Sequence, residues 1–95
     1  MGGIMQIWKF PIDLLDEHIS ITAPKGANPI HVGIDPKTGA ICVWAIVETG
    51  RALAKLKLRV YGTGHTLSSL TDERDHIGTI ITPEGFVWHF FKDVE

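Results

Sequence analysis

The sequence has a single cysteine, Cys42, and it lacks any apolar run of the length that crosses a membrane. One cysteine cannot form an internal disulfide, so we expect a fold held together by packing in a reducing cytosol. A membrane-spanning helix needs about 20 apolar residues, and the first residues show neither the charged region nor the apolar stretch of a signal peptide. These absences predict a cytoplasmic protein with no membrane partner.

Positive charge is also scarce. Nine Lys and Arg stand against eleven Asp and Glu, which gives a net charge of -2. Long nucleic acids and anionic membranes attract proteins that carry a positive field, so the composition predicts neither as a partner. Any site for a small anion has to be built locally from a few cations.

The short motifs that accompany catalysis or bound cofactors are missing from the sequence. It has no GxSxG nucleophile motif, no phosphate-binding loop and no complete dinucleotide fingerprint. Five histidines are present, yet none has the close spacing of metal ligands. These are His18, His31, His65, His76 and His89. We therefore expect no enzyme activity, no cofactor and no metal site, and His31 and His89 are predicted to be ordinary sheet residues.

Apolar residues, by contrast, are abundant for so short a chain. Ninety-five residues make one domain, and 44% of them are apolar. A domain of this size buries only about 60–65% of its unfolded surface, so the remaining apolar surface predicts a homo-oligomer. Residues 1–4 precede the first patterned segment and are expected to be an N-terminal extension or a cloning remnant, which leaves 5–95 as the domain.

Period-two alternation of apolar and polar residues dominates the chain, as it does in half-buried strands. Three segments show it clearly: 18–22, 29–34 and 55–61. The side chains expected to face inward are Ile19, Ile21, Ile30, Val32, Ile34, Leu56, Leu58 and Val60. Four further runs are strand-like by composition: 6–10, 40–47, 76–82 and 86–91.

Turn signals rich in Gly and Pro separate these seven runs. DPKTG (35–39) is expected to join its flanking strands as a hairpin, with 40–47 as a central strand. Short helical turns are expected only at 13–18 and 69–76, and 51–56 is read as a connection. The pattern predicts an all-β fold, a small antiparallel sandwich or barrel of six or seven strands.

The segment YGTGHTLSSL (61–70) looks most like a site. Backbone amides of a glycine turn can converge on an anion, and nearby hydroxyls can add donors. Lys55, Lys57 and Arg59 project from one strand face just before the turn, so Arg59 is expected to reach a ligand there. The predicted ligand-binding residues are Arg59, Tyr61, Gly62, Thr63, Gly64, His65 and Thr66. The alternative is an ordinary turn whose glycines supply positive φ, beside a solvated row of cations.

Several segments taken together resemble a group of small, uncharacterised bacteriophage proteins. These segments are IWKFPI near the start, HVGI, CVWAIV, LRVYGTGH, IGT and the terminal FVWHFF. Such proteins open with a WKFP-like segment, carry a strand ending in a V-x-GTGH turn and close with an aromatic strand. The resemblance spans the chain from Met5 onward. It implies a phage origin and a setting in the host cytoplasm, but it carries no activity.

These features favour a non-enzymatic protein that binds and sequesters a small anionic ligand as a homo-oligomer. The ligand would be a nucleotide signal of host defence. Two alternatives stay open: a phage inhibitor that binds a host protein through an exposed strand edge and aromatic patch, and a minor structural or accessory protein of the virion.

Overall fold

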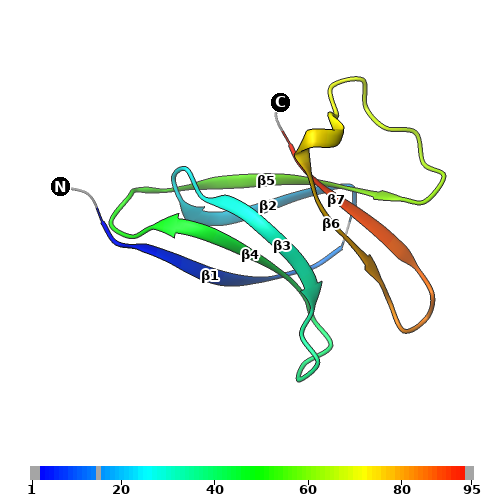
Figure 1. The fold of residues 1–95 in the computed structure, drawn as a ribbon, viewed down its shortest axis with the longest axis horizontal. Helices are drawn as coiled ribbons and strands as arrows, with labels where there is room; N and C mark the ends of the chain where they lie inside the picture. Colours follow the sequence, from blue (N-terminus) through cyan, green and yellow to red (C-terminus); the bar gives the residue numbers. More distant parts are fainter. Residues whose placement is uncertain (1–2, 15, 94–95) are drawn as a thin grey trace.

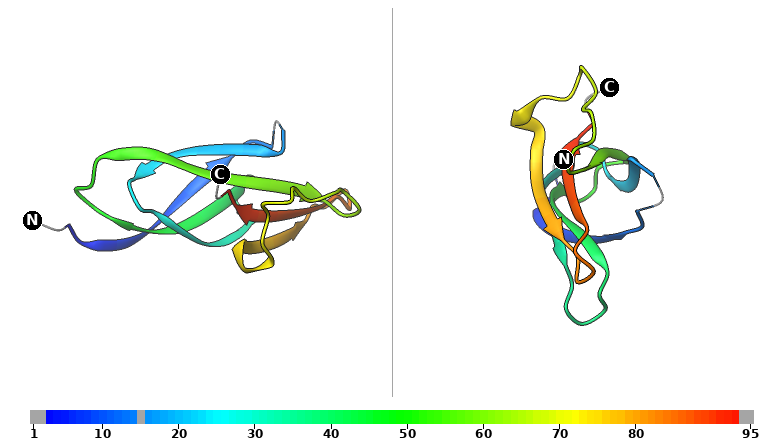
Figure 2. Two further views of the ribbon diagram at one scale, coloured as in Figure 1. Left: turned by 90° about the horizontal axis from the view of Figure 1, so that it is seen from above. Right: turned by 90° about the vertical axis from the view of Figure 1, so that its right-hand side faces the viewer.

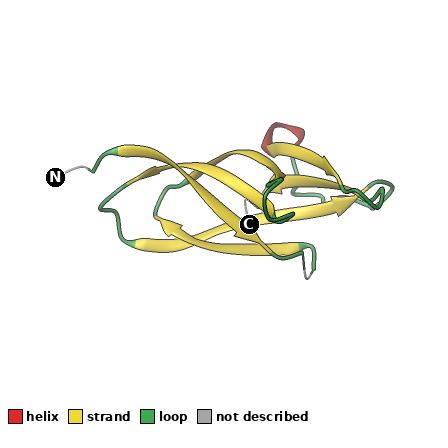
Figure 3. Ribbon diagram, turned by 90° about the horizontal axis from the view of Figure 1, so that it is seen from below, coloured by secondary structure: helices red, strands yellow, loops and turns green. Residues whose placement is uncertain are grey.

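A computed structural model describes residues 3–14 and 16–93 of the chain. Over these residues the fold is all-β, with one short 3-10 helix (Figure 1, Figure 3). The strands are β1 (Met5–Ile12), β2 (His18–Pro24), β3 (Asn28–Ile34), β4 (Ile41–Glu48), β5 (Leu53–Gly62), β6 (His76–Ile81) and β7 (Val87–Lys92), and the helix is η1 (Glu73–Asp75). No helix in the described ranges is long and apolar enough to cross a membrane. The predicted all-β fold is confirmed.

The strands form two antiparallel sheets, which face each other as a sandwich (Figure 2). One sheet has the order β1-β4-β3 and the other β2-β5-β7-β6. At one side of the sandwich β3 lies against β6. The two strands are so close there that a Cβ atom on Gly78 would come within 2.9 Å of Val32 Cγ1. Only glycine permits so close an approach. At the other side β1 and β2 are not paired with each other, and the sandwich is open there.

The core lies between the sheets and is built by the inward residues of each strand. Among the described residues, the largest fully buried side chains are those of Phe90, Leu58, Val43, Val47 and Cys42, in order of decreasing volume. Phe90 lies opposite Val60 on β5 and opposite Gly78 on β6, so it fills the centre of the four-stranded sheet. The expected inward positions in β2 and β5 are confirmed, with Ile19, Ile21, Leu58 and Val60 buried.

The DPKTG hairpin forms as predicted between β3 and β4, which pair antiparallel. Gly39 has a φ of +75° and its N–H donates to Asp35 O at 2.7 Å. The Asp35 carboxylate accepts from the Lys37 N–H at 2.9 Å and from Lys9 Nζ at 3.0 Å. These hydrogen bonds to Lys9 and Lys37 hold the pKa of Asp35 below its usual value, so the carboxylate stays charged and keeps the turn closed.

Three sequence expectations were wrong in detail. Ile30 is 42% exposed because a register shift between Pro29 and His31 turns Pro29 inward instead. β1 continues through Pro11, which an edge strand tolerates, since the missing N–H there breaks no ladder bond. β5 begins at Leu53, inside the expected connection.

The helical turns also differ from expectation. No helical turn forms in the described residues of segment 13–18, which omit position 15. The second turn is the three-residue η1, and its N-cap is Asp72. Hydrogen bonds from the Arg74 side chain and backbone N–H lower the pKa of Asp72 to about 2, so the cap stays charged over the ordinary pH range.

Candidate functional site

Arg59 is held in an ion-pair cluster on the outer face of β5. Its Nη1 donates to Glu17 Oε2 at 3.1 Å, and its Nε lies 3.6 Å from Asp93 Oδ2. The Arg59 and Asp93 side chains are only about a tenth exposed, whereas Glu17 is half exposed. The guanidinium that sequence reasoning assigned to a ligand is therefore already engaged by two carboxylates.

Tyr61 is buried and anchors the loop that follows β5. Its hydroxyl oxygen accepts from Arg59 Nη1 and from the Ser68 N–H, both at 3.3 Å, and lies 2.9 Å from Thr71 Oγ1. The ring packs edge-on against Phe91, with centroids 5.8 Å apart. One phenol thus holds residues 62–71 down on the outer face of the sheet.

The ionisation of Tyr61 can be observed directly, because it is the only tyrosine in the chain. Burial opposes formation of the phenolate, but the hydrogen bonds from Thr71, Ser68 and Arg59 outweigh it and lower the pKa below its usual 10.0. We expect absorbance at 295 nm to titrate below pH 10 in the folded protein. Thr71→Val should move the midpoint upward, whereas Thr66→Val should leave it unchanged; equal midpoints in all three proteins would contradict this hydrogen-bond network.

The GTGH turn folds back on itself. Gly64 has a φ of +91°, as predicted for a glycine turn, and the Gly62 N–H donates to His65 Nδ1 at 3.1 Å. The His65 ring covers the face of Gly62 on which a Cβ would come within 2.9 Å of it. Thr66 is exposed on the loop. The turn is thereby closed by its own histidine.

Arg59 and His65 lie on opposite faces of β5. Side chains alternate along a strand, so Gly62 shares the inward face with Val60, and the His65 ring lies on that face. His65 also lines a hollow of about 270 Å³. The other lining residues are Leu14, Asp16, Glu17, Val60 and Trp88. Two carboxylates on the wall of this hollow disfavour an anion, and in this arrangement Arg59 and the His65 ring face away from each other across β5.

The outer face of β5, β7 and β6 carries a row of hydrogen-bonded side chains. Thr63 Oγ1 lies 2.9 Å from His89 Nε2, and Thr79 Oγ1 lies 2.9 Å from His89 Nδ1 and 3.1 Å from His76 Nε2. Both ring nitrogens of His89 are therefore bonded, as the prediction of a satisfied sheet histidine required. Thr63, one of the predicted ligand residues, is engaged in this row.

Positive side chains gather elsewhere, around a hollow of about 520 Å³ beside β5. Its charged lining residues are Lys55, Lys57, Lys92 and Asp93, and the Asp93 carboxylate already lies beside Arg59. Lys55 Nζ donates to Thr22 Oγ1 at 2.7 Å, whereas Lys57 and Lys92 form no ion pair among the described residues. The hollow therefore has a local positive charge in a chain whose net charge is negative.

The strand edge beside this hollow also offers backbone donors. β7 pairs with β5 only from Leu58 onward, and the Asp93 N–H donates to Lys57 O at 3.0 Å. Because peptide groups alternate in direction along an antiparallel strand, the Lys55 and Lys57 peptide groups both point to this side. The remaining walls come from residues 26–29, between β2 and β3, and from Leu56. Lysine residues and strand-edge N–H groups that line the same hollow together suit an anion.

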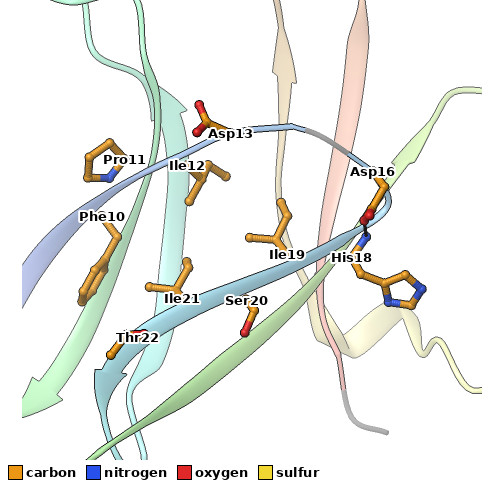
Figure 4. Close-up of a pocket in the computed structure, with 10 residues that line it drawn as sticks. All are labelled: Phe10, Pro11, Ile12, Asp13, Asp16, His18, Ile19, Ser20, Ile21 and Thr22. Atoms are coloured by element: carbon orange, nitrogen blue, oxygen red, sulfur yellow. Dashed lines mark hydrogen bonds between the residues drawn. The ribbon is translucent and has the colours of Figure 1, made fainter.

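A third hollow, of about 450 Å³, lies at the open side of the sandwich between β1 and β2. Figure 4 shows Phe10 and Ile12 on one strand and Ile19 and Ile21 on the other. Asp16 Oδ1 accepts from the His18 N–H at 2.6 Å at the rim (Figure 4). Among the described residues, its lining contains two acids and no lysine or arginine, so it does not favour an anion.

Sequence reasoning found part of the lysine hollow and missed the rest. Lys55 and Lys57 were noticed as a row on one strand, but Lys92 follows the aromatic run 86–91 and gave no local signal. Across residues 3–14 and 16–93, no group of three or more His, Cys, Asp or Glu could hold a metal ion.

The fold and these surfaces define a small β-sandwich domain with a local cationic hollow. The chain belongs to a family described as a domain of unknown function (DUF7352), which matches residues 4–95. No curated protein matches the chain, and no solved structure does so either.

Proposed function

We propose that this protein is a non-enzymatic binding protein for a small, phosphate-bearing anion, and that the anion occupies the hollow lined by Lys55, Lys57 and Lys92. The observation that carries the proposal is the gathering of three lysines from two strands around one hollow, where the only acid among the described residues is already engaged by Arg59. Lysine binds phosphate as a point charge, and two of these ammonium groups lack an acidic partner among the described residues.

The size and walls of the hollow favour a nucleotide over a free phosphate. Sites for small organic ligands measure about 300–1,000 Å³, and the hollow of about 520 Å³ falls in that range. Pro29, Leu56 and Ala27 supply apolar walls against which a base or sugar can pack. In the cell, the protein would act as a homo-oligomer that sequesters a nucleotide signal in the cytoplasm of a phage host.

Thermal shift across a panel of anions tests the proposal. The panel contains inorganic phosphate, pyrophosphate, AMP, cyclic mononucleotides and dinucleotides, and ADP-ribose. We expect at least one nucleotide to raise the melting temperature, and the rise to shrink with added NaCl because the contacts are charge-based. Lys57→Gln and Lys92→Gln should each abolish most of that shift.

Lys37→Gln is the matched control, because Lys37 is an exposed lysine at the tip of the β3–β4 hairpin. It should keep the full ligand response. A response lost in His65→Ala but retained in Lys57→Gln would instead move the ligand to the GTGH turn. The absence of any response across the panel, with all proteins folded, would contradict anion binding altogether.

A further inference from the structure

The outer edge of β1 presents unpaired backbone groups. Among the described residues β1 pairs only with β4. The Thr49 N–H donates to Ile4 O at 2.9 Å, which fixes the direction of the peptide groups along the strand. Because that direction alternates, the N–H and C=O groups of Met5, Ile7 and Lys9 point away from β4. Pro11 falls in the same phase, where its missing N–H breaks no bond of the sheet.

The side chains of this edge are apolar and exposed. Ile4 is 70% exposed, Met5 62%, Ile7 60% and Trp8 37%. Natural edge strands are usually protected by charges, prolines or bulges. The charged residue of β1 is Lys9, and its Nζ forms an ion pair with Asp35 Oδ2 at 3.0 Å, so its charge is partly neutralised. An eight-residue edge of this kind is suited to pairing with another strand.

We propose that the occupant is a second copy of the chain, with the two β1 strands paired antiparallel about a twofold axis. The segment Met5–Lys9 is the part of this edge free of proline, and its midpoint is Ile7. Centring the axis there places Ile7 opposite its counterpart and Met5 opposite Lys9 of the second copy. Every outward N–H and C=O between Met5 and Lys9 then finds a partner, and no two lysines face each other.

The pairing joins two three-stranded sheets into one sheet of six strands. Ile7 is paired with Ile46 on β4, so the apolar outer face of each copy continues across the axis. A large apolar side chain has a surface of about 200 Å². At the exposed fractions given above, the four residues of the edge together expose about 450 Å² of surface per copy. Stable interfaces bury about 800 Å² per partner, so this dimer belongs to the weaker class and dissociates on dilution.

Sedimentation velocity over a concentration series, together with amide hydrogen exchange, tests the proposal. We expect the wild type to shift from monomer to dimer as concentration rises. The Ile7 and Lys9 amides should become protected in step with that shift, because they would enter the new ladder. Ile7→Lys, which sets two lysines opposite each other, should raise the dissociation constant at least about tenfold.

Ile81→Lys is the control, since Ile81 is 68% exposed and lies at the end of β6 in the other sheet. It should dimerise like the wild type. A protein that stays monomeric up to about 1 mM overturns the proposal. So does a dimer that forms without protection of the Ile7 amide, or protection of that amide only when a different protein is added. The lysine hollow is tested separately, so the failure of one proposal leaves the other standing.

Discussion

Phe90→Ala is expected to lower the free energy of unfolding by about 3–5 kcal/mol. Phe90 is fully buried, and its cross-strand neighbours are Val60 and Gly78. Gly78 has no side chain to fill the space, so the cavity left by the lost ring cannot close easily. A domain of this length has a total stability of roughly 5–14 kcal/mol, so the variant should be near its limit.

Urea denaturation followed by tryptophan fluorescence measures this change. Phe86→Ala is the matched control, because Phe86 is 59% exposed and lies in the same aromatic run. Phe86→Ala should lower the free energy of unfolding by less than about 1 kcal/mol. Most of that loss comes from the stacking of Phe86 on Trp88, whose ring centroids lie 6.1 Å apart. Equal losses in the two variants would contradict the assignment of Phe90 to the core.

Arg59→Met is expected to lower the free energy of unfolding by about 2–4 kcal/mol, even in the absence of any ligand. The substitution leaves Asp93, which is about 10% exposed, without the guanidinium beside it, and removes a donor from the Tyr61 hydroxyl. Breaking a fully buried pair from one side costs about 3–5 kcal/mol. The expected value is lower here because Glu17 is half exposed and can be solvated again.

Arg51→Met serves as the comparison, because the Arg51 side chain is 51% exposed and pairs with Glu48 at 3.1 Å. Exposed pairs of this kind contribute about 0–1 kcal/mol, so this variant should unfold nearly as the wild type does. A double-mutant cycle of Arg59→Met with Asp93→Asn should recover part of the loss. If Arg59→Met is as stable as the wild type but loses anion binding, Arg59 is a ligand residue rather than a structural one.

This difference matters for the functional proposal. Loss of anion response in an Arg59 variant has two sources, a missing ligand contact or a displaced Asp93 at the edge of the lysine hollow. Stability measured beside ligand response separates the two. Lys57 and Lys92 are better probes of the site, since they form no ion pair among the described residues.

The strands, the hairpin and the inward residues of the regular segments could be predicted from the order of the amino acids. Alternation in 18–22 and 55–61 and the DPKTG turn depend on neighbours within a few residues, so local physics suffices to specify them. The hydrogen-bonded arrangement of His89 was also foreseeable, because a histidine within a strand lies beside polar side chains of the neighbouring strands.

Which cations are available to a ligand, by contrast, depends on how the strands pack together. Arg59 and His65 are six residues apart, yet strand alternation and the fold of the turn place them on opposite faces of β5. Glu17 and Asp93, far away in sequence, neutralise Arg59. Lys92 joins Lys55 and Lys57 only because β7 ends beside β5. Charge at a site is the sum of groups brought together by strand pairing across the whole chain, and no local pattern contains that information.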